Sequence, residues 1–224
     1  PSAARTALST WLSAGRAPSP AAVRAAARGA EPCGVDPAAH AQAACARLGL
    51  PVVADLAALA GRRFDGVVAS HVLEHVPDLS ATLASVRALL AAGGWLCVEV
   101  PNLASLRARL SVAALVARGA DERHRAFPIH LSYFTPATLT RALADAGFAI
   151  VARTTTGLGL GALRPGPPPA TAPNRPTARS TSPSAPPTAA RPRRAAPLYA
   201  AARGAFHRAL LGENLITIAV RTPG

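Results

Sequence analysis

Two short stretches carry side chains whose types could do chemistry together. The first reads HVLEH and supplies His71, Glu74 and His75, and the second reads HLSYF and supplies His130 and Tyr133. An imidazole has a pKa suited to removing a proton from a hydroxyl group near neutral pH. A carboxylate beside histidines can also hold a metal ion. These residues therefore indicate either proton transfer or metal binding. The strands and helices predicted around them help to decide between these two kinds of chemistry.

The HVLEH spacing fits the HxxEH pattern of inverted zinc peptidases, in which both histidines bind zinc from one helical face and the glutamate is the base. The surrounding sequence does not fit that chemistry. An apolar run leads directly into His71, and Pro77 ends any helix almost at once. A zinc ligand is also expected far downstream, but Glu213 is the only acidic residue after Asp145. We therefore reject a zinc peptidase.

The HVLEH stretch follows a predicted strand and precedes a predicted helix. An apolar run from Phe64 to Ser70 has the pattern of a buried strand. A helical pattern opens at Pro77 and is expected to stop at Gly93-Gly94. A second apolar strand runs from Trp95 to Val100. Such a strand-helix-strand unit predicts a parallel crossover in an open α/β sheet. Ligands of these sheets bind beyond the carboxyl ends of the strands, which is where HVLEH lies.

The block from Phe64 to Asn102 resembles the class I S-adenosylmethionine-dependent methyltransferases, most closely the branch with small-molecule and sugar O-methyltransferases. Its motifs are FDxVxxxHVLEHVPD and LxxGGxLxxEVPN. The resemblance extends to Gly34-Val35-Asp36, to His130–Phe148 and to Gly212–Val220, about two thirds of the chain in all. It implies an open, mostly parallel seven-stranded sheet with helices on both faces and an antiparallel last strand, and S-adenosyl-L-methionine as the cofactor.

The resemblance also implies where the cofactor binds. The first glycine of the family's cofactor loop falls on Gly15, and Ala17 and Ser19 stand where the family has the next two glycines. Asp36 would accept hydrogen bonds from the ribose hydroxyls. Asp55 would contact the adenine amino group, and Leu56 would pack beside the ring. Each lost glycine costs backbone freedom, so the loop is where cofactor binding is least secure.

Both aspartates also have a structural alternative. Asp36 precedes a proline and would suit a turn, whereas Asp55 would suit the N-cap of the next helix.

Ser70 and His71 lie at the end of the apolar run, and the resemblance implies that they line the methionine part of the cofactor.

On the acceptor side the resemblance favours His130 with Tyr133, because family members carry a similar HLxxF run near the acceptor. His75 also borders the predicted crevice and is a further candidate base. The alternatives are that His75 caps structure beneath the site and that His130 is a hydrogen-bonded histidine at a helix entrance. Some quinone O-methyltransferases that are similar to this stretch hold a divalent cation through its Glu and His. Glu74 and His75 with one further ligand would do the same, but we expect no metal.

The rest of the sequence predicts one domain with an insertion. Residues 1–160 would form the first six strands, 161–197 a disordered insertion, and 198–224 a helix and the final strand of the same domain. Further expected strands are Glu31–Val35, Pro51–Ala54, Phe148–Thr155 and Leu215–Val220. Further expected helices are Pro37–Leu48, Leu103–Ala120, one from Thr135 as N-cap to Gly147 as stop, and Leu198–Leu211.

The positive charge of the chain is concentrated in a tail. Arginine supplies all 24 basic charges of this +13 chain, and Val151–Leu211 holds nine arginines and no acidic residue. Eleven of the 22 prolines lie in Leu163–Pro197, a composition that cannot bury enough apolar surface to fold. We read this tail as a solvated linker and expect no nucleic-acid partner. The three cysteines have no CxxC spacing and no run of about 18 apolar residues occurs, so we expect a cytoplasmic protein without a membrane span.

Two functions remain open from the sequence. The first is methyl transfer from S-adenosylmethionine to a small-molecule or sugar acceptor, most simply at a hydroxyl. The second is a methyltransferase-like domain that has lost cofactor binding and acts as a scaffold or partner-binding subunit, for which the altered loop after Gly15 is the evidence.

Overall fold

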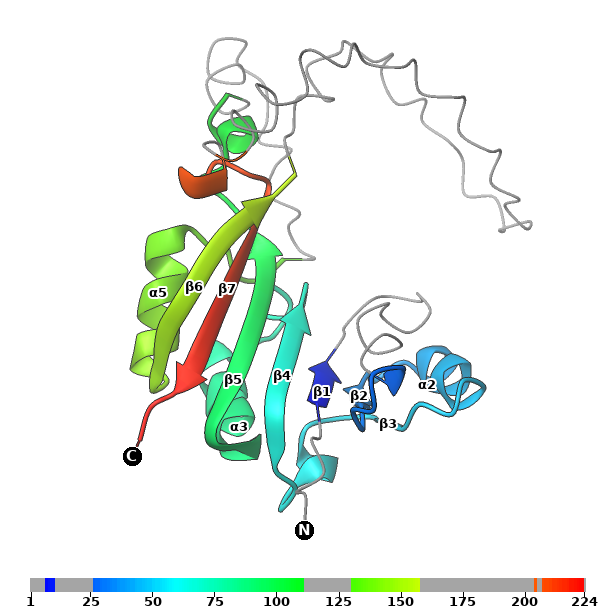
Figure 1. Ribbon diagram of the computed structural model, residues 1–224. Helices are drawn as coiled ribbons and strands as arrows, with labels where there is room; N and C mark the ends of the chain where they lie inside the picture. The colour runs from blue at the N-terminus through cyan, green and yellow to red at the C-terminus, as the bar shows by residue number, and fades with distance from the viewer. Residues whose placement is uncertain (1–6, 11–25, 111–129, 158–203, 205–206, 224) are drawn as a thin grey trace, which may run out of the picture.

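The computed structural model describes residues 7–10, 26–110, 130–157, 204 and 207–223 (Figure 1). Within these residues seven strands form one sheet in the order β3-β2-β1-β4-β5-β7-β6. The strands are β1 (Ala7–Thr10), β2 (Cys33–Val35), β3 (Val52–Val53), β4 (Phe64–Ser70), β5 (Leu90–Pro101), β6 (Phe148–Thr156) and β7 (Asn214–Arg221). Neighbours from β3 to β5 are parallel, whereas β7 is antiparallel to both β5 and β6. The expected open, mostly parallel sheet with an antiparallel last strand is confirmed.

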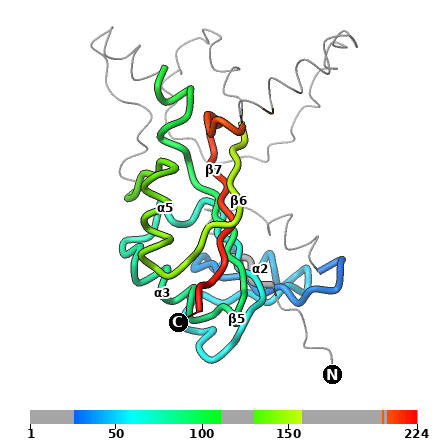
Figure 2. The backbone as a smooth tube through the Cα atoms, turned by 60° about the vertical axis from the view of Figure 1, so that its left-hand side comes forward, coloured from blue at the N-terminus to red at the C-terminus, as the bar shows by residue number. Residues whose placement is uncertain are grey.

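Helices cover both faces of this sheet. The described helices are α2 (Ala39–Ala46), α3 (Leu79–Leu89) and α5 (Pro136–Asp145), with a 3-10 turn at Ala57–Leu59. Figure 2 shows α3 and α5 on one side of the strands and α2 on the other. The starts of α3 and α5 follow from local sequence. The side chain of Asp78 accepts a hydrogen bond from the Ala81 amide, and Thr135 forms a reciprocal capping box with Thr138.

The end of α3 differs from the sequence prediction. The helix ends at Leu89, not at Gly93-Gly94, and Leu90 is already extended and paired with Phe64 of β4. The strand β5 therefore begins five residues before the predicted Trp95. Leu89, the last residue of the helix, and Leu90, the first residue of the strand, are both buried. The apolar pattern alone therefore could not show where the helix ends and the strand begins. The positive φ of 73° at Gly93 is instead used inside the β5 segment.

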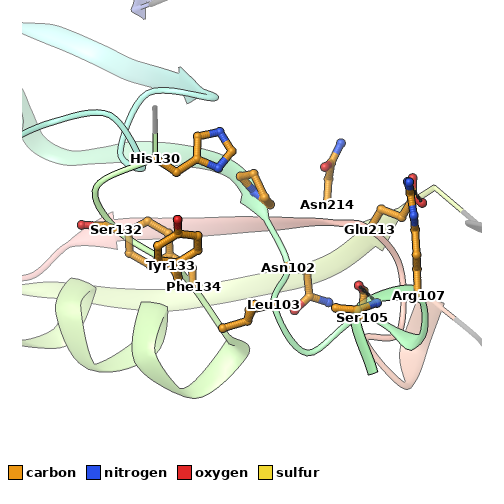
Figure 3. Close-up of a pocket in the computed structure, with 12 residues that line it drawn as sticks. Asn102, Leu103, Ser105, Arg107, His130, Ser132, Tyr133, Phe134, Glu213 and Asn214 are labelled. Carbon is orange, nitrogen blue, oxygen red and sulfur yellow. Dashed lines mark hydrogen bonds and ion pairs between the residues drawn. The ribbon is translucent and has the colours of Figure 1, made fainter. Parts of the chain in front are cut away.

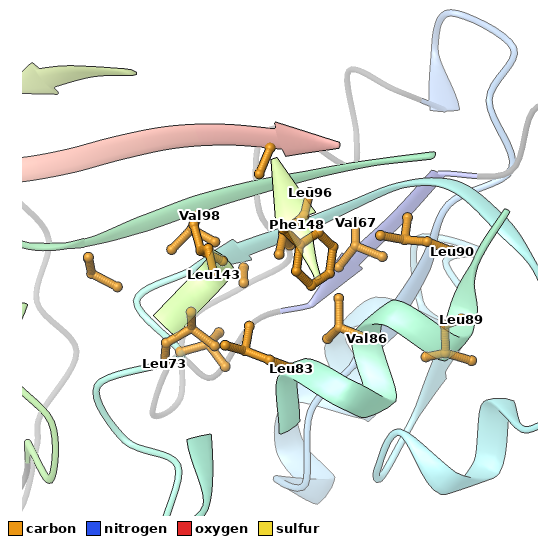
Figure 4. Packing of buried hydrophobic residues seen from close by; sticks show 14 of the residues in the cluster. Val67, Leu73, Leu83, Val86, Leu89, Leu90, Leu96, Val98, Leu143 and Phe148 are labelled. Atoms are coloured by element: carbon orange, nitrogen blue, oxygen red, sulfur yellow. The ribbon is translucent and has the colours of Figure 1, made fainter. Parts of the chain in front are cut away.

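The core lies between the sheet and the α3 and α5 helices. Figure 4 shows Val67 of β4 and Leu96 of β5 facing Leu83 and Val86 of α3. These four side chains are at most 3% exposed. The apolar run that predicted β4 is thus buried between the sheet and these helices. Its burial holds the carboxyl end of β4, where HVLEH begins, in place.

Leu139 is completely buried on α5, so truncating it should leave a cavity. We expect Leu139→Ala to lower the free energy of unfolding by about 2–5 kcal/mol, measured by urea denaturation. The matched control is Leu48→Ala, at a side chain that is 60% exposed, where we expect a change within about 0.5 kcal/mol. Equal losses in the two variants would contradict the packing described here.

Several predicted segments lie outside the described residues. These are the loop with Gly15 and Ala17, the insertion 161–197, and most of the expected helices Leu103–Ala120 and Leu198–Leu211. Of the first helix, residues 106–110 are described and are helical. In the part of the chain that is described, no helix is both long and apolar enough to cross a membrane.

Candidate functional site

The carboxyl ends of the parallel strands meet at one edge of the sheet. Thr10 of β1 is in register with Val35 of β2 and with Ala69 of β4. Consequently Asp36, directly after β2, and Ser70, the last residue of β4, lie on the same edge as the chain that leaves β1. Of the predicted site residues, Asp36 follows β2, Asp55 follows β3, and Ser70, His71 and His75 lie at or after the end of β4, as expected for an open α/β sheet.

The HVLEH segment makes a sharp turn rather than a helix. Ser70 donates a hydrogen bond through Oγ to Oε2 of Glu99 on β5 (2.8 Å), and the His71 amide donates to the Glu99 carbonyl (2.8 Å). His71 then adopts a φ of 54°, in the left-handed region that a non-glycine residue occupies only when its surroundings hold it there. This turn excludes the single helical face that a zinc peptidase needs.

Glu74 is the buried centre of the turn. Its side chain is 1% exposed, and its Oε1 lies 3.1 Å from Nδ1 of His71 and 3.9 Å from Nε2 of His75. The hydrogen bond from His71 to the Glu74 carboxylate raises the pKa of the His71 imidazole, against a smaller lowering by burial. His71 and Glu74 therefore form a hydrogen-bonded pair, which a buried carboxyl group needs.

The second stretch docks onto this turn through its backbone. The amides of Leu131 and Ser132 both donate to the Glu74 carbonyl, at 2.7 and 3.1 Å. As a result the His130 ring lies edge-on to His75, with ring centroids 4.9 Å apart, and Tyr133 lies 6.3 Å beyond His130. The three predicted acceptor-side residues are thus brought together. Burial lowers the pKa of His130, aided by the neighbouring histidines and opposed by Glu74, so its imidazole is neutral near pH 7.

A cavity of about 280 Å³ adjoins His130 (Figure 3). His130 and Tyr133 lie at one end of it, and Arg107 and Glu213 form an ion pair of 2.8 Å at the other. The Tyr133 hydroxyl is buried and has no hydrogen-bond partner among the described residues. The lining is therefore mixed, with apolar walls and a few polar groups, as in sites for small polar molecules. Its remaining lining residues are Pro101, Asn102, Leu103, Ser105, Ala108, Ser132, Phe134 and Asn214.

Asn102 ties the cavity walls together, a role that the sequence did not indicate. Its Nδ2 donates to the carbonyls of Leu210 (2.9 Å) and Gly212 (2.8 Å), and its Oδ1 accepts from the Ala104 amide (3.0 Å). The end of β5 is thereby held to the segment before β7. Asn102 belongs to the VPN motif that carried the resemblance, so the motif could have pointed to this residue. Its hydrogen-bond partners, more than 100 residues away, could not be predicted from the sequence.

On the cofactor side both aspartates accept a local backbone hydrogen bond, although the N-cap of the 3-10 turn after Asp55 is Leu56 and not Asp55. Oδ1 of Asp36, a residue only 6% exposed, accepts from the Ala38 amide at 2.8 Å and so closes a turn. Oδ1 of Asp55 accepts from the Ala58 amide at 2.9 Å, and Leu56 packs partly buried against the core. A carboxylate has more acceptor positions than one such bond uses, so neither bond excludes a ligand. Their cofactor contacts stay predictions, as do those of Gly15 and Ala17, which lie outside the described residues.

The strand order and the crevice at the strand ends define the Rossmann-like fold of class I methyltransferases. The family described as "Methyltransferase domain" matches residues 3–153, two thirds of the sequence, and the chain belongs to this family. It is a domain of the class that uses S-adenosylmethionine as methyl donor. No curated protein sequence is significantly similar to the chain.

Solved structures share the fold. A SAM-dependent methyltransferase from Archaeoglobus fulgidus is 20% identical, with a TM-score of 0.57, over 97% of this chain and 86% of its own. The Burkholderia thailandensis 1,6-didemethyltoxoflavin-N1-methyltransferase, solved with 1,6-didemethyltoxoflavin and S-adenosylhomocysteine, is 18% identical, with a TM-score of 0.52, over 98% and 72%. The N-methyltransferase NodS from Bradyrhizobium japonicum WM9, solved with S-adenosylhomocysteine, is 15% identical, with a TM-score of 0.50, over 98% and 78%.

Proposed function

We propose that this domain transfers the methyl group of S-adenosylmethionine to a hydroxyl of a small-molecule or sugar acceptor. The observation that carries the proposal is the gathering of His75, His130 and Tyr133 beside a cavity at the carboxyl end of β5. The cofactor side of the same edge holds Asp36. Donor and acceptor would therefore meet above the ends of β4 and β5.

The cofactor side would use the residues that follow the strands. Asp36 would accept hydrogen bonds from the ribose hydroxyls, as acidic residues do at this place in dinucleotide-binding folds. Asp55 and Leu56 would hold the adenine. Ser70 and His71 would line the methionine part, where the bonds from these two residues to Glu99 fix the turn. The loop at Gly15 and Ala17 would approach the cofactor backbone.

The acceptor side has one proton to remove. S-adenosylmethionine supplies an already activated methyl group, so the protein mainly has to align the acceptor oxygen in line with the methyl carbon. His130, neutral near pH 7, would take up the hydroxyl proton as the new oxygen-carbon bond forms. The Tyr133 hydroxyl, which no described residue hydrogen-bonds, would bond the acceptor, and His75 would support the His130 ring from its edge.

The test is methyl transfer itself. The full chain is incubated with methyl-labelled S-adenosylmethionine and a panel of sugars, phenols and amines, and the products are separated and analysed by mass spectrometry. We expect label in an O-methyl group of at least one hydroxyl acceptor. Transfer only to amines would overturn the choice of acceptor atom. If the folded chain labelled no acceptor and bound no S-adenosylhomocysteine, a scaffold role would replace the proposal.

A further inference from the structure

We infer that Glu99, at the carboxyl end of β5, makes the site prefer the positively charged methyl donor over its neutral product. The inference rests on the proposed function, because it assigns Glu99 a role toward S-adenosylmethionine. In the proposed reaction the sulfonium loses its methyl group and its positive charge, and the proton of the acceptor hydroxyl passes to His130. Donor and product therefore differ at the sulfur by one methyl group and one charge. A carboxylate beside that sulfur would distinguish the two ligands.

Neutral groups hold the Glu99 carboxylate in place. Its Oε2 accepts a hydrogen bond from Oγ of Ser70 at 2.8 Å, and its Oε1 accepts one from Nδ2 of Asn214 at 3.4 Å. A hydroxyl and an amide orient a carboxylate without neutralising its charge. The Glu99 side chain is 27% exposed. A ligand can therefore reach this charge, and water and salt screen it less than they screen a fully exposed charge.

The negative charge of Glu99 is not balanced by a cation of its own. Among the described residues, His71 is the one basic side chain within 4.0 Å of the Glu99 carboxylate. His71 is held by a different group, because its Nδ1 lies 3.1 Å from Oε1 of Glu74, whereas its Nε2 is 4.0 Å from Oε1 of Glu99. Two carboxyl groups thus share one imidazole, and a protonated His71 can balance only one of them. A cation that binds beside Glu99 would therefore gain an electrostatic attraction.

The strand order places Glu99 between the donor and the acceptor. Along this edge of the sheet, Asp55 follows β3, Asp36 follows β2, Ser70 ends β4 and Asn214 begins β7. Asn214 also lines the cavity assigned to the acceptor (Figure 3). With the adenine at Asp55 and the ribose at Asp36, the cofactor would run along the edge toward this cavity, and its sulfur would be the part that faces the acceptor. Glu99 pairs in register with Ser70 and bonds Asn214, so the sulfur would lie beside it.

This preference would matter after each turnover. Donor and product share the adenosine and amino-acid parts, so the contacts expected from Asp36 and Asp55 would bind both ligands equally. Only a contact at the sulfur can favour the donor. The attraction to Glu99 would be lost when the methyl group leaves, and fresh donor would then displace the product more readily.

The experiment compares the affinities of the two ligands by calorimetric titration. S-adenosylmethionine and S-adenosylhomocysteine are each titrated into the full chain, into Glu99→Gln and into Glu99→Asp. Glutamine has the shape of glutamate and keeps an acceptor oxygen for Ser70 but carries no charge, whereas aspartate keeps the charge. The matched control is Glu31→Gln, the same substitution at an exposed residue before β2, at the opposite edge of the sheet. Circular dichroism shows whether each variant keeps the fold.

We expect Glu99→Gln to weaken the binding of S-adenosylmethionine by roughly 10-fold or more and to change that of S-adenosylhomocysteine by less than about 3-fold. Glu99→Asp should keep most of the preference for the donor, and Glu31→Gln should bind both ligands as the unmodified chain does. In the unmodified chain, added salt should weaken the binding of the donor more than that of the product, because salt screens the extra charge interaction. This last comparison needs no variant.

Equal weakening of both ligands in a folded Glu99→Gln would overturn the inference, because Glu99 would then only brace the turn at Ser70. Affinities for donor and product that respond alike to the substitution and to salt would also overturn it. In both cases the proposed function would stand, since the unmodified chain would still bind donor and product. A folded, unmodified chain that binds neither ligand would overturn the proposed function and this inference with it.

Discussion

Replacing Asp36 with asparagine should weaken the binding of S-adenosylhomocysteine by roughly 100-fold. Hydrogen bonds to a charged group contribute about 1.5–3 kcal/mol each, and loss of the charge toward two ribose hydroxyls would cost about 3 kcal/mol in all, or two factors of ten. Asparagine keeps an oxygen that can accept from the Ala38 amide, the bond that closes the turn at this position. The substitution therefore tests the ligand role with the structural role left in place.

The measurement is calorimetric titration of S-adenosylhomocysteine into both proteins. The matched control is Asp65→Asn, because Asp65 is an exposed carboxylate on β4, and we expect its affinity to equal that of the unmodified chain. If Asp36→Asn bound as tightly as the unmodified chain, the carboxylate would be a turn residue alone, and the ribose anchor would have to be sought elsewhere on this edge.

Replacing His130 with asparagine should lower the turnover number by roughly 100-fold or more, within the range of general-base contributions, while the affinity for S-adenosylhomocysteine stays unchanged. Asparagine is polar and of similar reach but cannot take up the proton. The assay is methyl transfer to whichever hydroxyl acceptor the panel identifies.

A loss of turnover at unchanged cofactor affinity would identify His130 as the base. The matched control is His40→Asn, at an exposed histidine in the first turn of α2, and it should retain full turnover. Unchanged turnover in His130→Asn would contradict any role of this residue in the reaction, and a parallel loss of cofactor affinity would indicate a damaged fold.

Local sequence was sufficient for the elements that position the site. The run from Phe64 to Ser70 was predicted as a strand and is β4, because a short apolar run closed by small and polar residues is typical of a buried parallel strand. Asp78 and Thr135 cap their helices through hydrogen bonds within three residues. The family resemblance supplied the seven-stranded sheet with its antiparallel last strand, which no local pattern contains.

Long-range contacts were beyond a reading of the sequence. His130 lies beside His75 because two amides next to it bond to the Glu74 carbonyl, and such backbone bonds do not depend on side-chain type. The side chain of Asn102 likewise donates to the backbone carbonyls of Leu210 and Gly212, which any residue at those positions would supply. At Asp36 the sequence offered a turn or a ligand as alternatives. The turn is formed, yet one side chain has acceptors for both.

The most direct test of the central claim is calorimetric titration of S-adenosylhomocysteine into the unmodified full chain. The account predicts saturable binding at one site per chain with a dissociation constant in the micromolar range, despite the altered residues after Gly15. A folded chain that shows no heat of binding and no thermal stabilisation at millimolar ligand would contradict it. The domain would then have kept the methyltransferase fold without the cofactor site.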